Sequence, residues 1–131
     1  MIFNLKQYLF NETGYKIFAN PRDFTNGDDI PPAYIQIVEE GGTSTAWFKF
    51  NNYTVQVITK DIDAPNARVR AYVIYHLLDN RFGLVLPEVV VDGLTYSAIT
   101  IAQISANTEP GFLGYDENGR AEFSNNYRIL V

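Results

Sequence analysis

Residues that commonly carry catalysis are sparse in this sequence. Histidine occurs once, at His76, and cysteine is absent. A histidine that acts as a general base needs a nucleophile to deprotonate and a carboxylate to orient its ring. Asp79 and Asn80 follow His76 by three and four residues, but no serine or cysteine lies within four residues of it. We therefore predict a structural histidine and no catalytic residue. The alternative is a small acidic enzyme or ligand-binding domain in which the fold brings a carboxylate to His76.

The carboxylates occur in four close pairs, a pattern worth testing against cation sites. A calcium loop places its oxygens at the spacing D-x-[DN]-x-[DN]-G with a distant Glu, and none of the pairs has that spacing. The adjacent glycines Gly41 and Gly42 lack the lysine of a phosphate-binding loop. We therefore predict turns and helix caps at these positions, with no metal and no cofactor. The pairs are Asp28/Asp29, Glu39/Glu40, Asp61/Asp63 and Asp116/Glu117.

Length and composition predict a single domain that spans residues 1–131. Hydrophobic residues make up 47% of the chain, which is ample for a core, and the 15% aromatic share leaves rings to cover an interface. Trp47 is such a candidate, in the core or at a subunit interface. The net charge of −5 argues against tight binding to nucleic acid. No apolar run approaches the ~20 residues that span a bilayer, so we expect a soluble intracellular protein with no membrane partner.

Two segments have the periodicity of helices. Residues 1–13 have apolar side chains at helical spacing and are followed by Gly14, which predicts a short N-terminal helix. One long helix is predicted over about 65–82, with proline in its first turn and Gly83 as its stop. An apolar stripe along this helix would face a sheet. The stripe consists of Ala67, Ala71, Ile74, Tyr75, Leu78 and Phe82.

The remaining segments alternate like strands or contain turn residues. The pair Asn51-Asn52 indicates a bulge or a tight hairpin, and Asp92-Gly93 is a strong signal for a two-residue β-hairpin. Residues 107–119 contain glycine and proline and are predicted to form a long loop. The element order predicts an α+β fold, in which a mostly antiparallel mixed sheet carries the two helices, plus a β-hairpin. The main predicted strands are 34–38, ending in a turn at 39–42, then 46–59 and 121–131.

Several phrases of the sequence resemble those of one group of proteins. They are PPAYIQIVEEGG, then YTVQVITKDIDAPNARVRAYVIYHLL ending in NRFG, the hairpin VVVDGLTYSAITIAQIS and the tail GFLGYDENGRAEFSNNYRILV. In element order and local phrases, roughly residues 30–131 are similar to the tail-terminator and minor capsid proteins of long-tailed bacteriophages. Other head-tail completion or adaptor proteins, which form small rings at the same junction, are a close alternative.

The resemblance implies a structural virion protein and not an enzyme. A subunit of this kind assembles into a hexameric ring at the head-tail junction, ends the tail tube and offers a docking surface to the head connector. Its partners would be copies of itself, the tail tube protein and the head-tail connector protein. DNA would pass through the lumen without specific binding, which suits an acidic chain because carboxylates repel phosphates. Its place would be the neck or tail of the virion, and the host cytoplasm during assembly.

Two groups of residues are candidates for such contacts. Arg68, Arg70 and Arg81 lie off the apolar stripe of the predicted helix, where they would meet water or acidic groups on a neighbouring subunit. The predicted loop carries apolar side chains that would either order on contact with a tube or a neighbouring ring, or dock on their own sheet. These loop candidates are Phe112, Leu113, Tyr115 and Asp116.

Overall fold

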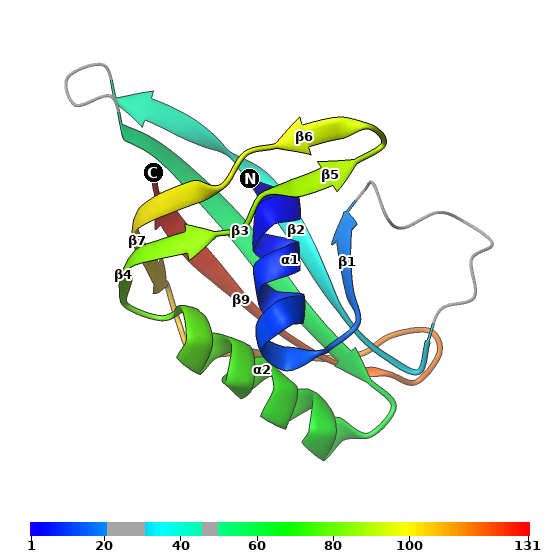
Figure 1. Cartoon of the computed structure of the whole chain (residues 1–131). Coiled ribbons are helices and arrows are strands. Elements are labelled where there is room, and N and C mark those ends of the chain that lie inside the picture. Colours follow the sequence, from blue (N-terminus) through cyan, green and yellow to red (C-terminus); the bar gives the residue numbers. More distant parts are fainter. Residues whose placement is uncertain (21–30, 46–49) are drawn as a thin grey trace.

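A helix opens the described part of the chain, and a second helix separates a first group of strands from a later one, as Figure 1 shows. A computed structural model describes residues 1–20, 31–45 and 50–131. The elements in this part of the chain are α1 (Ile2–Thr13), β1 (Ile17–Asn20), β2 (Ala33–Thr45), β3 (Phe50–Asp61), α2 (Ala64–Leu78), β4 (Arg81–Leu86), β5 (Val89–Val91), β6 (Leu94–Tyr96), β7 (Ile99–Ala106), β8 (Gly111–Tyr115) and β9 (Ala121–Leu130).

Most of these strands form one sheet, in the order β1-β2-β3-β9-β7-β4. β9 is long enough to serve two partners along the same edge, because β8 pairs with residues 121–124 and β7 with residues 127–130. β1 and β2 run parallel, whereas the other described pairs of this sheet are antiparallel. β5 and β6 form a separate two-stranded sheet. The predicted α+β class with a mostly antiparallel sheet is therefore confirmed.

Both helices lie on the same face of the sheet (Figure 1). Leu5 and Leu9 of α1 and Ile74 and Leu78 of α2 are fully buried in one core with inward-facing strand residues. Burying a side chain of this size contributes roughly 1.5–3 kcal/mol, so the helices are held chiefly by these contacts. The strands supply every second side chain to the core, as a period of two requires. Those residues include Ile35, Ile37, Val55, Val57, Tyr127 and Ile129.

The prediction of one long helix over about 65–82 is wrong, because both helices are short. α2 ends at Leu78, and Asn80 takes a left-handed conformation with φ 54°, which asparagine tolerates better than most residues. The chain then continues as β4, so Phe82 and Gly83 belong to a strand. Phe82 fits the spacing of both a helix and a strand, so the apolar stripe alone could not show which of the two structures it belongs to.

The predicted end of the N-terminal helix and the predicted β-hairpin are both confirmed. α1 ends at Gly14, whose φ of 71° lets its backbone N–H donate to the Phe10 carbonyl at 2.8 Å. The hairpin of β5 and β6 turns at Asp92-Gly93, with φ 53° and 78°. Positive φ at both central residues is the geometry that matches the twist of a two-residue hairpin.

The segment 107–119, predicted to be a long loop, contains strand β8. Its register with β9 shifts between Phe112 and Gly114, so that Leu113 is an extra residue. The bulge hides the simple alternation by which a strand is recognised in a sequence. A glycine-rich segment that reads as a loop therefore forms an additional strand of the sheet.

The first strand predicted in the main sheet is also longer than expected. β2 runs on to Thr45, past the turn predicted at its end. Its register with β3 shifts between Glu39 and Gly42, whereas no shift occurs at Asn51-Asn52. The irregularity lies in the strand that contains adjacent glycines, which accommodate a bulge at little steric cost.

Candidate interaction surface

Strand β8 exposes three large apolar side chains, which we call the β8 patch: Phe112, Leu113 and Tyr115. They are 54%, 60% and 65% exposed. The bulge at Leu113 brings Phe112 and Tyr115 together, with ring centroids 5.5 Å apart, and Phe112 also contacts Phe123 of β9 at 5.4 Å. Contiguous exposed apolar groups on a monomer commonly mark a site of interaction.

The turn after β8 is held by Asp116. Its Oδ1 accepts hydrogen bonds from the backbone N–H groups of Asn118 (2.9 Å) and Arg120 (2.8 Å). Burial acts to raise the pKa of this carboxyl, but those hydrogen bonds and the charges of Arg120 and Lys60 outweigh it and lower the pKa. Asp116, a contact residue predicted from the sequence, thus stabilises the turn beside the β8 patch.

Charged side chains on the face away from the helices extend this support. Lys60 of β3 lies 3.1 Å from Glu122 of β9 and 4.0 Å from Asp116. The guanidinium of Arg120 is buried, lies 3.5 Å from Asp116 and donates to the Pro31 carbonyl at 3.2 Å. Both cations stand 5.7 Å from the ring of buried Tyr34. Sequence reasoning missed this cluster because its members come from distant segments with no local motif.

The three predicted interface arginines do not form one row. Arg70 lies 3.9 Å from Asp61 and over the ring of Tyr15 at 4.7 Å, so its guanidinium is engaged within the chain. Arg68 is exposed on α2 beside Tyr72. Arg81 is exposed on β4 and donates to the Leu77 carbonyl at 3.4 Å. Because α2 ends at Leu78, Arg81 is the first residue of β4 and does not share a helix with Arg68 and Arg70.

Trp47 and His76 are the remaining positions singled out from the sequence. Trp47, the remaining interface candidate, lies outside the described residues. His76 is exposed on α2, and its ring contacts those of Tyr72 and Tyr75, with centroids 6.3 Å and 5.4 Å away. No cluster of three or more metal-binding side chains occurs among the residues that the structure describes. The contacts around His76 are those of a side chain packed among aromatic rings.

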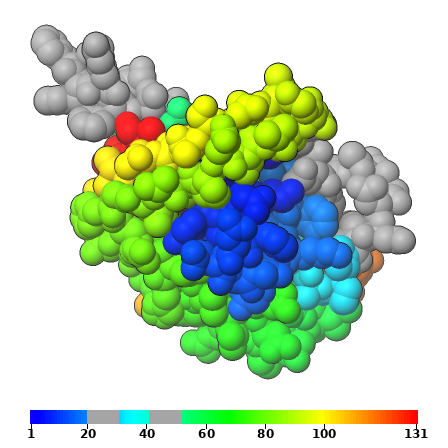
Figure 2. Space-filling view, in the orientation of Figure 1, coloured from blue at the N-terminus to red at the C-terminus, as the bar shows by residue number. Residues whose placement is uncertain are grey.

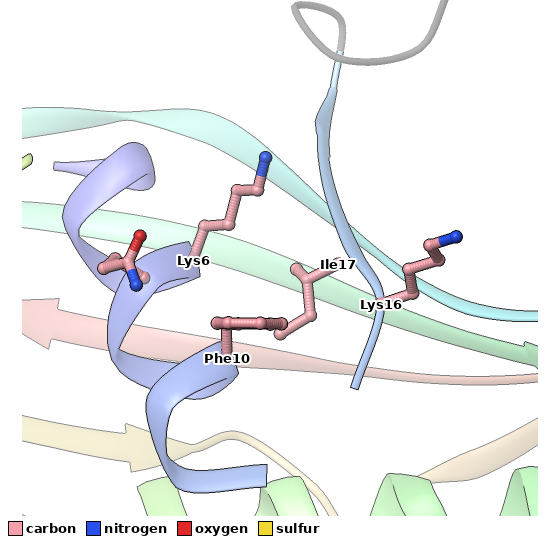
Figure 3. Close-up of a pocket in the computed structure, with 5 residues that line it drawn as sticks. Lys6, Phe10, Lys16 and Ile17 are labelled. Carbon is pink, nitrogen blue, oxygen red and sulfur yellow. The ribbon is translucent and has the colours of Figure 1, made fainter. Parts of the chain in front are cut away.

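A pocket between α1 and β1 was not singled out from the sequence. Its volume is about 270 Å³. Figure 3 shows Phe10 and Ile17 lying against each other, with Lys6 and Lys16 on either side. Figure 2 shows α1 at the centre of this face of the molecule, below the β5–β6 hairpin. We call this cavity the α1–β1 pocket; Gln7 completes its lining. A helical spacing of four between Lys6 and Phe10 was the only sequence signal for it.

The sequence matches no protein-family model and no curated protein. Over the described ranges, neither helix has the length and hydropathy needed to cross a membrane.

Proposed function

We propose that this chain is a structural virion protein of the bacteriophage head-tail junction. It forms a ring that ends the tail tube and presents a docking surface to the head connector. The sequence resemblance supplies the family, and the β8 patch is the observation that carries the proposal. A protein that acts by assembly needs apolar surface that is exposed before assembly and buried after it.

The physical character of the β8 patch supports such a role. Aromatic side chains are the commonest anchors of protein interfaces, and they contribute most where their positions are fixed before contact. The rings of Phe112 and Tyr115 already contact each other, and the turn beyond them is fixed by Asp116 and Arg120. The patch would therefore lose little side-chain entropy on binding a neighbouring subunit or the tube.

The charge of the chain agrees with the same proposal. A net charge of −5 on each copy gives a ring an acidic overall field. DNA would cross such a ring without adhering to it, since phosphates and carboxylates repel each other. The acidic field also opposes association, so any contact between copies has to overcome repulsion by local apolar and charge complementarity.

The test is assembly of the purified protein, alone and with tail tubes that lack their terminator. Light scattering should give the mass of a ring, and electron microscopy should show a ring at one end of each tube. Leu113→Asp should reduce occupancy of tube ends at least tenfold at equal concentration, on the order of the loss of one anchor. Val90→Asp, at a similarly exposed valine of the hairpin, is the matched control and should bind like wild type.

Two outcomes would count against the proposal. A protein that stays monomeric at high concentration and also ignores tail tubes would contradict it. Binding to the head connector without binding to tubes would instead favour an adaptor at the same junction. Monomers in solution that form rings on tubes would agree with the proposal, because assembly can require the tube as a template.

A further inference from the structure

One row of paired residues crosses the sheet from the α1–β1 pocket to the β8 patch. Residues directly paired across strands face the same side of a sheet, so this row stays on the helix side throughout. Neighbouring strands lie about 4.8 Å apart, which puts the two ends of the row about 19 Å from each other. In order across β1, β2, β3, β9 and β8, the row consists of Ile17, Ile35, Thr59, Phe123 and Phe112.

The two ends of this row are chemically complementary. At one end, the α1–β1 pocket has Ile17 and the half-exposed ring of Phe10 between two lysines. At the other end, two exposed carboxylates, Glu109 and Glu117, precede and follow the exposed rings of the β8 patch along the chain. The chain has a net charge of −5, whereas the two charged side chains that line this cavity are both positive. Apolar groups thus match apolar groups, and cations match anions.

We propose that the α1–β1 pocket of one copy receives the β8 patch and Glu117 of the next copy. This inference rests on the proposed self-assembly and names the surfaces that perform it. The two surfaces differ and lie at opposite edges of the sheet, so the contact is head to tail. Contacts of this kind close into a ring when the rotation between copies fits. In that ring the row of paired side chains continues from Phe112 of one subunit to Ile17 of its neighbour.

A zero-length carbodiimide cross-link tests the contact directly. The reagent joins a lysine to a carboxylate only when the two are in contact, and a link that carries one label of each kind has to join two copies. We expect a Lys16–Glu117 cross-link in wild-type protein assembled alone or on tail tubes. Assembly from a mixture of isotopically labelled and unlabelled protein should give cross-linked peptides with one label of each kind.

Charge reversal tests the same contact through assembly. Lys16→Glu or Glu117→Lys should raise the concentration needed for half-assembly about two- to fivefold, as expected for one partly exposed ion pair. The double variant should return to within about twofold of wild type, because every interface then holds the reversed pair. Glu88→Lys, at an exposed glutamate that belongs to neither the pocket lining nor the β8 patch, is the control and should assemble like wild type.

The outcomes separate this inference from the proposed function. Rings without the Lys16–Glu117 cross-link, and with assembly indifferent to both reversals, would overturn the docking inference and leave the ring intact. A symmetric dimer as the assembled form would overturn the head-to-tail arrangement. Failure of wild-type protein to associate with itself or with tubes would overturn both proposals.

Discussion

β8 and the β5–β6 hairpin both project large apolar side chains into solvent, yet they are held in different ways. The hairpin is shaped by its own turn, Asp92-Gly93, and forms a sheet of its own. It is joined to the rest of the chain by buried Asn4, whose Nδ2 donates to carbonyls at both ends of the hairpin. β8 is instead part of the main sheet, and its turn is fixed by side chains from β3 and β9.

This difference predicts two levels of local stability. Segments open with free energies that follow how many buried contacts they make with the rest of the protein. The β8 patch should open only when the edge of the main sheet opens, whereas the hairpin should open separately. An assembly surface with a fixed geometry is therefore expected on β8 and not on the hairpin.

The largest effect should come from removing the support of β8. Arg120→Ala leaves the carboxylate of Asp116 without its nearest cation and the Pro31 carbonyl without its donor. Breaking a buried charge pair from one side is costly, and we expect a loss of about 3 kcal/mol in the free energy of unfolding. Urea denaturation measures this loss, and hydrogen exchange should show it at the β8 amides.

Glu117→Ala is the control for this variant, because Glu117 lies in the same turn but is exposed. It should change stability by no more than about 0.5 kcal/mol. Equal loss of protection in β5 and β6 in the Arg120 variant would argue against the two levels of stability, since its contacts with Asp116, Pro31 and Tyr34 lie outside the hairpin.

Asn4→Ala tests the hairpin from its base. The amide Nδ2 lies 2.9 Å, 3.2 Å and 3.1 Å from the carbonyls of Pro87, Tyr96 and Ser97. Losing a buried donor to several carbonyls should cost about 2 kcal/mol. Hydrogen exchange should accelerate in β5 and β6 first, while β8 keeps its protection. Asn11→Ala, on an exposed position of the same helix, should leave both regions unchanged.

Gly93→Ala should act more weakly and only on the hairpin. At φ 78° an alanine is strained by about 1 kcal/mol, although no atom lies within 4 Å of the added methyl group. Gly111→Ala provides the contrast, because Gly111 has no such φ and only the Ser124 carbonyl at 4.0 Å near its side-chain position. Urea midpoints that fall equally for both substitutions would show that the conformation of Gly93 is not the cause.

The features that could be predicted from the sequence are those with local causes. Gly14 ends α1, and Asp92-Gly93 turns the hairpin, because each uses a backbone conformation that few residues accept. The end of α2 was missed because Phe82 fits both periods and the stop comes from Asn80. The hydrogen bond from the Ala106 N–H to Asp79 that fixes this end spans 27 residues, and no window of sequence contains it.

The candidate site also has a part that could be predicted from the sequence and a part that depends on the whole fold. The apolar character of Phe112, Leu113 and Tyr115 was evident from composition, but their place on a strand was hidden by the bulge. The support by Lys60 and Arg120 and the α1–β1 pocket depend on which strands are neighbours. That order places β9 beside β3, although more than 50 residues separate them along the chain. Pairings of this kind are fixed by the whole fold.

The smallest predicted effect concerns acid. The folded-state pKa of Asp116 is lowered, so its unfolded-state pKa, near 3.9, is the higher of the two. Above the unfolded value, the ionised carboxylate contributes its full share of stability. That share is lost as the pH falls through the folded value. Between about pH 5 and pH 2, the urea midpoint of wild type should therefore fall more steeply than that of Asp116→Asn.

Glu117→Gln is the control for the dependence of the urea midpoint on pH, since it removes an exposed carboxylate from the same turn. Its pH dependence should parallel that of wild type. The protection of the β8 amides, measured against the intrinsic exchange rate at the same pH, should fall with acid in step with the global change, because the carboxylate that titrates accepts two hydrogen bonds in the turn after β8. Loss of protection confined to the hairpin would contradict this prediction, because the acid-sensitive contact would then not be that of Asp116.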